Sequence, residues 1–241
     1  MKISIVIPAF NEERLLADTL ASINKARASF DSANIESELI VCDNNSTDRT
    51  AEIARAAGAT VVFEAVNQIG RARNTGAAAA SGDWLLFVDA DSKPSAELFT
   101  EVTEQIRSGR CVAGGCTLRL EGNHRIPNVI TRVWNWKSRQ RRWVAGSFIF
   151  VETAVFRKIG GFNREFYAGE ELDLSNRLNA VAKETGREVV ILHRHPMLTS
   201  DRKVRLYTGW EHLRFMIKVV TSRHRTMRDK SACHAWYDGR R

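Results

Sequence analysis

Two aspartates one residue apart, Asp89 and Asp91, follow an apolar run from Trp84 to Val88. Side chains alternate along an extended chain, so both carboxylates can face the same way. Paired carboxylates offer the oxygen ligands that hard cations such as Mg²⁺ and Mn²⁺ prefer. An isolated Asp-x-Asp more often forms a solvated turn, but the apolar run before this pair favours a metal site.

Two more polar clusters follow apolar runs in the first half of the chain. One is Pro-Ala-Phe-Asn-Glu-Glu at 8–13, and the other is Asp-Asn-Asn-Ser-Thr-Asp at 43–48. If each apolar run is a strand of one parallel sheet, the three clusters lie together at its carboxyl edge, where ligands bind in open α/β sheets. The sequence therefore predicts one site built from three strand ends.

The periodicity of apolar residues predicts the elements that position these clusters. Strands are expected over 2–7, 38–42, 60–63 and 84–88, and helices between them over 15–23, 48–57 and 69–81. This alternation predicts an α/β fold with a mostly parallel central sheet flanked by helices. Further along, we expect helices over 95–107, 153–159 and 171–184, and strands over 111–120, 147–151 and 189–192. Regularity lapses over 121–144, which we interpret as a loop or an insertion that binds the acceptor.

Composition limits the class of protein. The chain has 241 residues, 44% hydrophobic and 27% charged, which excludes disordered, collagen-like and coiled-coil chains. No apolar run approaches the roughly 18 to 20 residues that cross a bilayer, and the first run ends at Pro8, too early for a signal peptide. We therefore expect a cytoplasmic protein. Its four cysteines form no Cys-x-x-Cys pair, so free thiols are expected and a structural zinc site is not.

Charge divides the chain into two halves. Residues 1–120 hold 12 Lys and Arg against 16 Asp and Glu, whereas residues 121–241 hold 24 against 12. An acidic first half suits a metal site, and a basic second half suits phosphates, an anionic membrane face or nucleic acid. A merely solvated basic surface is the alternative.

The motifs at these positions resemble the family 2 glycosyltransferases, inverting nucleotide-sugar enzymes of the GT-A fold. The resemblance is close over residues 3–92 and is carried by Ile-Val-Ile-Pro-Ala-Phe-Asn-Glu-Glu at 5–13, Val-Cys-Asp-Asn-Asn-Ser-Thr-Asp at 41–48, Arg-Ala-Arg-Asn-Thr-Gly at 71–76 and Leu-Phe-Val-Asp-Ala-Asp at 86–91. It resumes at 159–162 and 169–178. Elsewhere it is loose.

The resemblance implies how the first half binds a nucleoside diphosphate. Asp43 accepts a hydrogen bond from the base, Asp89 lies near the ribose and the metal, and Asp91 binds Mg²⁺ or Mn²⁺. The other nucleotide-binding residues implied are Pro8, Phe10, Asn11, Glu12, Arg73 and Ala90. Arg73 would add positive charge near the phosphates, although an arginine on an exposed helix is more often merely solvated.

An inverting transfer also needs a base that takes the proton of the acceptor hydroxyl. The resemblance places Glu171 at the base position, where the family usually has aspartate. Glu170 would orient the acceptor. Asp173 is a competing candidate, but it stands four residues before Arg177 and can form a helix ion pair with it. All three acids also stand where carboxylates stabilise a helix N-terminus, which is the structural alternative.

Two features of the second half remain open in the sequence. His193 and His195 follow the last predicted strand, and in some related enzymes a histidine from this region is a further metal ligand. Residues 132–143 alternate aromatic and cationic side chains, which suits a sugar, a lipid phosphate or a membrane headgroup. No recognised nucleic-acid motif accompanies them, so a nucleic-acid partner is not expected.

These observations predict a metal-dependent inverting glycosyltransferase, with a UDP-sugar favoured as donor. The acceptor is a glycan, a lipid-linked molecule or a small molecule, and the enzyme is cytoplasmic with a peripheral contact at the inner face of the membrane as an open alternative. We expect a GT-A domain over 1–200, with a nucleotide and metal half at 1–92 and an acceptor half at 93–200, and a basic helical extension at 201–241. The alternatives are a nucleotidyltransferase, which usually begins with a glycine-rich basic loop that this chain lacks, and a non-catalytic nucleotide-sugar-binding protein.

Overall fold

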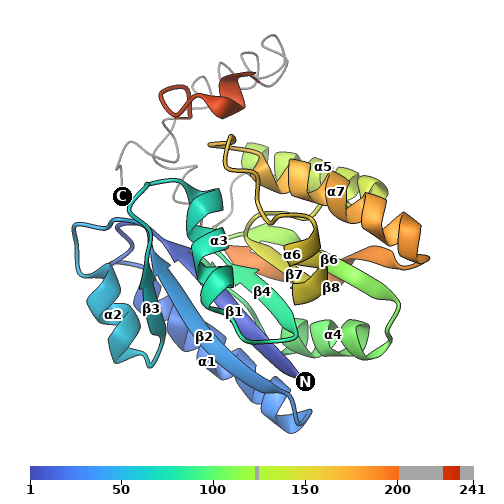
Figure 1. Ribbon diagram of the computed structural model, residues 1–241, viewed down its shortest axis with the longest axis horizontal. Helices are drawn as coiled ribbons and strands as arrows, with labels where there is room; N and C mark the ends of the chain where they lie inside the picture. The colour runs from blue at the N-terminus through green and yellow to red at the C-terminus, as the bar shows by residue number, and fades with distance from the viewer. Residues whose placement is uncertain (123–124, 201–224, 234–241) are drawn as a thin grey trace.

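The computed structural model describes residues 1–122, 125–200 and 225–233. These residues form one eight-stranded sheet in the order β3-β2-β1-β4-β7-β6-β8-β5 (Figure 1). The strands are β1 (Lys2–Ala9), β2 (Glu36–Asp43), β3 (Thr60–Phe63), β4 (Trp84–Val88), β5 (Ser92–Lys93), β6 (Cys111–Leu120), β7 (Phe148–Glu152) and β8 (Glu188–Thr199). The first four are parallel to one another, and β6 is parallel to β8, so the predicted mostly parallel α/β sheet is confirmed.

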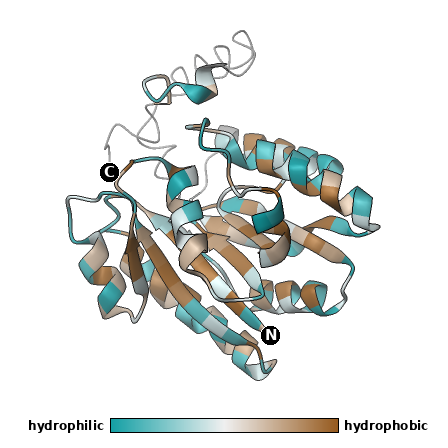
Figure 2. Cartoon of the chain, in the orientation of Figure 1, coloured by the Kyte–Doolittle hydropathy of each residue, from teal (hydrophilic) through white to brown (hydrophobic). Residues whose placement is uncertain are grey.

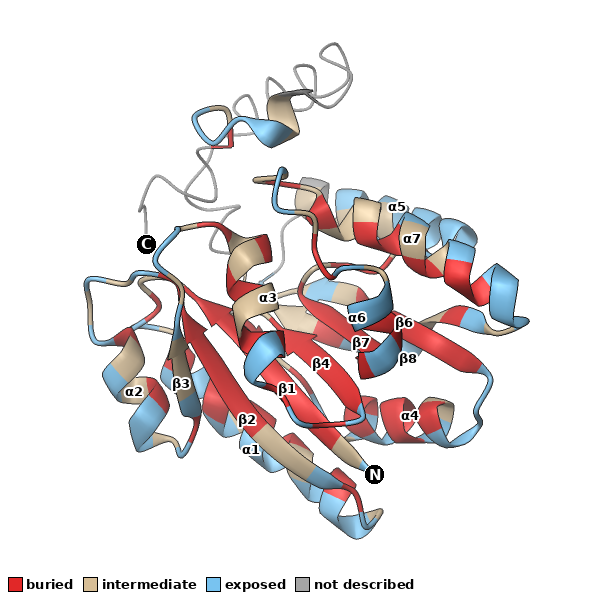
Figure 3. Ribbon diagram, in the orientation of Figure 1, coloured by how far each residue is buried: buried red, intermediate tan, exposed pale blue. Residues whose placement is uncertain are grey.

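Helices cover both faces of the sheet. They are α1 (Leu16–Ser32), α2 (Thr50–Ala56), α3 (Ile69–Ala79), α4 (Ala96–Arg107), α5 (Arg125–Arg141), α6 (Thr153–Lys158) and α7 (Glu170–Thr185), and a short 3₁₀ helix, η1, covers Arg225–Arg228. Apolar residues of α1 and α4 pack in one core cluster, and those of α3, α6 and α7 pack in another. The strands between these layers are largely apolar (Figure 2). Strands β1, β2, β4, β6 and β7 are buried along most of their length, whereas β3 and β8 are only partly buried (Figure 3).

Helix α3 packs closely on β1 and β2. Gly76 lies directly over Val6 of β1, and a Cβ atom at this position would overlap the valine side chain. The missing side chain lets α3 approach these strands, and Cys42 of β2 is the next neighbour of this position. This packing fixes where the side chains of α3 reach the edge of the sheet.

Two predictions about the second half of the chain were wrong. Residues 121–144 do not form an irregular loop, because 125–141 are helix α5. The last strand does not end at Leu192 but continues as β8 to Thr199, with a register shift between the partners of Cys116 and Leu118. Most of the predicted basic extension, 201–224 and 234–241, lies outside the described residues.

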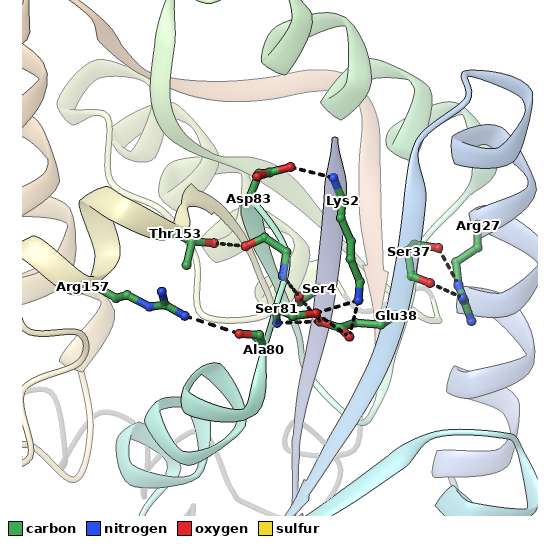
Figure 4. A network of polar contacts seen from close by, with 11 residues as sticks. Lys2, Ser4, Arg27, Ser37, Glu38, Ala80, Ser81, Asp83, Thr153 and Arg157 are labelled. Atoms are coloured by element: carbon green, nitrogen blue, oxygen red, sulfur yellow. Dashed lines mark hydrogen bonds and ion pairs between the residues drawn. The ribbon is translucent and has the colours of Figure 1, made fainter.

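A network of polar contacts joins β1 and β2 to the turn before β4, at the amino-terminal end of the strands (Figure 4). The Glu38 carboxylate accepts hydrogen bonds from Ser4 Oγ at 2.5 Å and from the Ser81 backbone N–H at 2.7 Å, and it pairs with Lys2 Nζ at 2.8 Å. Partial burial opposes ionisation of this group, but these contacts lower the pKa of Glu38 to about 2.

Replacing Glu38 with Gln is expected to lower the free energy of unfolding by about 1–3 kcal/mol at pH 7, because several donors lose a charged acceptor. A carboxyl group whose pKa is lowered by folding stabilises the protein above its unfolded pKa, and this stabilisation is lost as the pH falls. The difference between wild type and E38Q in urea denaturation should therefore shrink from pH 5 toward pH 3. Glu36→Gln, at an exposed position of the same strand, is the control. A difference that is independent of pH would contradict the charged role of Glu38.

Candidate functional site

The loops that follow β1 and β2 hold each other by side-chain to backbone hydrogen bonds. Asn11 has a left-handed backbone, with φ of 52°, and its N–H donates to Ser46 Oγ at 3.0 Å. In return, the Thr47 N–H donates to Asn11 Oδ1 at 2.8 Å. Left-handed backbone is uncommon outside glycine, and asparagine is one of the residues that tolerate it. The two loops therefore form one rigid unit at the carboxyl edge of the sheet.

Two acidic residues of these loops, Asp43 and Glu12, are buried at the same edge. Asp43 pairs with Ala9 in the register of β2 and β1, and its Oδ1 accepts from the Ser46 N–H at 3.0 Å. Glu12 is also buried, and its N–H donates to Thr50 Oγ1 at 2.8 Å. The structure thus brings the predicted nucleotide-binding residues of the two loops together. They are Pro8, Phe10, Asn11, Glu12 and Asp43.

The Asp89-Ala90-Asp91 segment is fixed through its backbone. The Asp89 N–H donates to the carbonyl of Ser147, just before β7, at 3.3 Å. The Ala90 carbonyl accepts from Thr19 Oγ1 of α1 at 2.8 Å. The Asp91 carbonyl accepts from the Ser200 N–H at 3.2 Å, just after β8 ends. Three separate parts of the chain therefore hold this turn, which places both carboxylates in the wall of a cavity.

That cavity has a volume of about 440 Å³ and lies between the end of β4 and helices α3, α5 and α7. One side carries Asp89 and Asp91, and the start of α7 contributes Glu170 and Glu171. The opposite wall is mostly apolar and comes from β6 and α5. It includes Leu118, Leu120, Ile130 and Trp134. The cavity thus joins the two acidic clusters that are 80 residues apart in the sequence.

Arg73 of α3 connects these two clusters. Its Nη1 lies 2.5 Å from Glu170 Oε1, and its Nη2 lies 2.9 Å from Asp89 Oδ1 and 3.0 Å from the Gly146 carbonyl oxygen. Only 1% of its surface is exposed, and its guanidinium stacks 5.1 Å from the centre of the Phe162 ring. Arg73 was expected near the phosphates or solvated on the helix surface. It is not solvated: it lines the cavity, and its two Nη groups bond to two carboxylates and a backbone carbonyl.

Burial and charge shift the acid-base properties of this group of residues. Burial alone would lower the pKa of Arg73, but the charges of Asp89 and Glu170 raise it above its ordinary value. Burial raises the pKa of Glu171 to about 8, and the neighbouring charge of Glu170 adds to this effect. A carboxyl group in the cavity whose pKa is close to neutral is suited to exchange protons with a ligand.

Asp173 has a different role from its neighbours on α7. Its Oδ2 accepts from Arg177 Nη2 at 2.6 Å and from Arg177 Nε at 2.9 Å, and Arg177 Nη1 donates to the Ile159 and Gly161 carbonyls. The expected helix ion pair is therefore present. Asp173 is not among the residues that line the cavity. It holds Arg177, which in turn bonds α7 to the loop after α6.

The two histidines lie apart from this cavity. His193 and His195 fall in the irregular stretch of β8, where the strand runs past β6 with extra residues. His195 Nδ1 lies 2.5 Å from Glu101 Oε1 of α4, and His193 lines a second cavity with Glu101. The expectation that either histidine adds a ligand beside Asp91 is therefore not supported by their placement.

The remaining donors fit a hard divalent cation. The described residues contain no group of three or more His, Cys, Asp or Glu side chains placed to bind a metal by themselves. The cavity wall nevertheless offers carboxylate oxygens of Asp89 and Asp91. Mg²⁺ and similar ions are commonly bound by one or two carboxylates together with substrate phosphates. This donor set therefore fits a cation that binds with a diphosphate.

Sequence reasoning missed two residues that organise the edge of the sheet. Asn44 Nδ2 donates to the Glu64 and Val66 carbonyls, at 3.1 and 2.7 Å, and Asn44 Oδ1 accepts from the Gln68 N–H at 2.9 Å. The side chain of Gln68 donates to the Arg164 carbonyl at 2.6 Å. Both residues are buried. The signal available in the sequence was a side-chain amide next to the end of a predicted strand or the start of a predicted helix.

Comparison with known proteins places the chain in a family. The model of glycosyl transferase family 2 matches residues 4–159. Uncharacterized glycosyltransferase EpsJ of Bacillus subtilis is 29% identical over 128 residues, which are 51% of this chain and 36% of that protein. Uncharacterized glycosyltransferase Mb0553 of Mycobacterium bovis is 30% identical over 141 residues, which are 58% of this chain and 60% of that protein. The chain thus covers less than two thirds of either relative.

Solved structures share the fold at low sequence identity. Mannosyltransferase PcManGT from Pyrobaculum calidifontis superposes with a TM-score of 0.69 at 18% identity, covering 96% of this chain and 64% of that one. Residues 1–349 of S. aureus TarS superpose with a TM-score of 0.65 at 19% identity, covering 98% of this chain and 68% of the other. The chain belongs to glycosyl transferase family 2 and has the GT-A fold.

Proposed function

We propose that the chain is an inverting glycosyltransferase that moves a sugar from a nucleoside diphosphate sugar to an acceptor hydroxyl. The observation that carries this proposal is the single cavity with Asp89 and Asp91 on one side and Glu170 and Glu171 on another. In such a transfer the donor and the catalytic base must face the same reacting carbon. This cavity offers Asp89 and Asp91 for the donor side and Glu171 for the base. The nucleoside lies along the adjacent edge of the sheet, against the loops that contain Asp43 and Glu12.

The proposed chemistry assigns the proton to Glu171. Its carboxylate takes the proton of the acceptor hydroxyl while the hydroxyl oxygen bonds to the anomeric carbon of the donor. The bond between that carbon and the phosphate oxygen breaks, and the nucleoside diphosphate leaves with the electron pair. Because the attack comes from the side opposite the leaving group, the anomeric configuration inverts. Glu170 is held by Arg73 beside this point and would orient the acceptor.

Asp91, with Asp89, would hold a divalent cation beside the diphosphate. When bound, Mg²⁺ or Mn²⁺ supplies positive charge that stabilises the leaving diphosphate. Solved structures of similar fold support this choice: PcManGT was determined with GDP-Man and Mn²⁺, and TarS 1–349 with UDP-GlcNAc. We favour a UDP-sugar as donor, and a thermal-shift screen of UDP- and GDP-sugars with and without Mn²⁺ tests this choice.

Transfer itself is tested by product analysis. Incubation with the donor identified in that screen should release nucleoside diphosphate, by slow hydrolysis or by transfer to an added acceptor. ¹H NMR of the first sugar product should show an anomeric configuration opposite to that of the donor. Retention of configuration would contradict the assignment of Glu171. Donor binding with neither hydrolysis nor transfer, across acceptor classes, would favour a non-catalytic nucleotide-sugar-binding protein.

Asp91→Ala is expected to weaken nucleoside diphosphate binding in Mn²⁺ by about 10²-fold or more. Substituting a residue that only hydrogen-bonds to a metal ligand already lowers metal affinity by about 10–100-fold, and losing the ligand itself should cost at least as much. In EDTA, wild type and variant should bind equally weakly. Isothermal titration calorimetry measures both conditions, and Asp31→Ala, at an exposed position of α1, is the control. Tight binding by wild type in EDTA, or an unchanged D91A variant in Mn²⁺, would show that Asp91 is not the metal ligand.

A further inference from the structure

Helix α5 turns a polar face toward the sheet. Asn135 Oδ1 accepts from the Leu118 N–H at 2.9 Å, and Asn135 Nδ2 donates to the Leu118 carbonyl at 2.9 Å. Ser138 is fully buried one turn later, where its hydroxyl donates to the Trp143 carbonyl at 2.6 Å. The usual surface helix buries apolar residues against its domain. Here the side chain of Asn135 attaches α5 to the backbone of β6 by two hydrogen bonds instead.

Three apolar residues of α5 face outward, away from the side that carries Asn135 and Ser138. Val129, Val133 and Trp136 are 57%, 50% and 62% exposed, and we call these three residues the α5 stripe. Their spacing places them on one line along the helix. Isolated exposed apolar residues are ordinary, but three in line on one side of a single helix form a contiguous patch, which marks an interaction surface.

Cations border the α5 stripe on both sides. At about 100° per residue, Arg132 and Arg139 fall on one side of it, and Lys137 and Arg141 on the other. All four are exposed, and α5 contains no Asp or Glu. Among the described residues, no carboxylate pairs with Arg132, Lys137 or Arg139. An outward apolar stripe between two rows of cations, with a tryptophan in the stripe, is the pattern of a helix that lies in a membrane interface.

We propose that α5 docks the protein on an anionic lipid bilayer, lying parallel to its surface. The α5 stripe enters the boundary between headgroups and acyl chains, and the bordering cations contact lipid phosphates. None of the helices in the described part of the chain is long and apolar enough to cross a membrane. Ile130, the neighbour of Val129 in the sequence, is exposed and also lines the cavity, so the cavity lies next to the docked surface.

Charge favours this occupant over the others. A second copy of the chain would bring the same rows of cations together. Residues 201–224 hold six Lys and Arg against two Asp and Glu, so they carry the same sign as α5. A nucleic acid would match the cations but offers no apolar phase for the three residues of the stripe. An anionic bilayer matches both features.

The test is co-sedimentation of the full chain with vesicles of phosphatidylcholine alone or with one part in three of phosphatidylglycerol, at low and at physiological salt. We expect wild type to pellet with the anionic vesicles, and less so as salt rises. Val129→Ser/Val133→Ser/Trp136→Ser should lower the partition coefficient more than about tenfold. Arg132→Gln/Lys137→Gln/Arg139→Gln should lower it at least as much in low salt. Lys25→Gln/Arg55→Gln/Arg110→Gln removes the same charge elsewhere and should pellet nearly as wild type.

A second measurement reports the contact directly. Lipids with brominated acyl chains should quench tryptophan fluorescence of the wild type, and Trp136→Phe should lose most of that quenching while still pelleting. No pelleting with anionic vesicles in low salt would overturn the proposal. So would unchanged pelleting of the stripe variant. Two further results would also overturn the proposal and would name another occupant of the α5 stripe. A dimer in light scattering that the stripe substitutions dissociate would identify a second copy of the chain. A loss of several degrees in the Tm of the stripe variant would show that another segment of the same chain covers the stripe.

Discussion

Replacing Glu171 with Gln is expected to lower kcat by about 10³-fold and to leave donor binding within about twofold of wild type. General bases contribute about 10²–10⁴-fold, and glutamine keeps nearly the same shape without accepting the proton. Because the group acts mainly in the transition state, the loss should appear in kcat rather than in donor affinity. Initial rates with saturating donor, and calorimetry with nucleoside diphosphate, measure the two quantities separately.

Asp173→Asn is the matched control for this substitution. Its carboxylate bonds to Arg177 rather than lining the cavity, so the variant should keep turnover within a few-fold of wild type. It should instead lose about 1 kcal/mol of stability, because a partly exposed helix ion pair contributes little. If D173N is folded but inactive and E171Q remains active, the catalytic assignments of these two residues must be exchanged.

The raised pKa of Glu171 gives an independent measurement in the absence of donor and metal. A carboxyl group whose pKa rises on folding costs stability as the pH rises from its unfolded value of about 4.5 to its folded value of about 8. Glutamine removes this cost. The Tm of E171Q relative to wild type should therefore increase from pH 5 to pH 8. A constant difference would show that Glu171 is ionised at neutral pH in the free protein.

The first half of the fold was predictable because its strands are apolar throughout and end in polar clusters. Strands β3 and β4 lie at the predicted residues, and parallel strands bring those clusters to one edge without further information. Helix α5 was not predictable in this way. Its buried face carries Asn135 and Ser138, and Val129, Val133 and Trp136 face outward, so a search for an inward apolar periodicity reads the segment as irregular.

The positions of the site residues were predictable where strand ends determine them, and were not predictable where a side chain crosses between elements. Asp89 and Asp91 follow directly from β4. The carboxylate partners of Arg73 could not be predicted, since an arginine on a helix reads as solvated until two carboxylates from distant segments surround it. The contact of His195 was hidden for a related reason, because its partner Glu101 comes from α4 and is buried.

Arg73→Met is expected to lower the free energy of unfolding by about 3–5 kcal/mol, which is the usual cost of removing one partner of a buried ion pair. Methionine has a similar length and packs well, so the loss reflects charge rather than volume. Without the guanidinium, the carboxyl groups of Glu170 and Asp89 lose their shared partner. Urea denaturation at pH 7 measures the change. Arg71→Met, on the same helix at a half-exposed position, should cost less than about 1 kcal/mol.

The double variant Arg73→Met/Glu170→Met separates the charge effect from a loss of packing. Glu170 is buried and bonds to Arg73 at 2.5 Å, so removing both members takes away the more deeply buried of the two carboxylates that the single variant leaves without Arg73. The double variant should therefore be more stable than Arg73→Met alone, since apolar replacements of buried ion pairs are often neutral. If the double variant is less stable than the single one, Glu170 has a stabilising partner other than Arg73. The ion pair would then not be what joins α3 to α7.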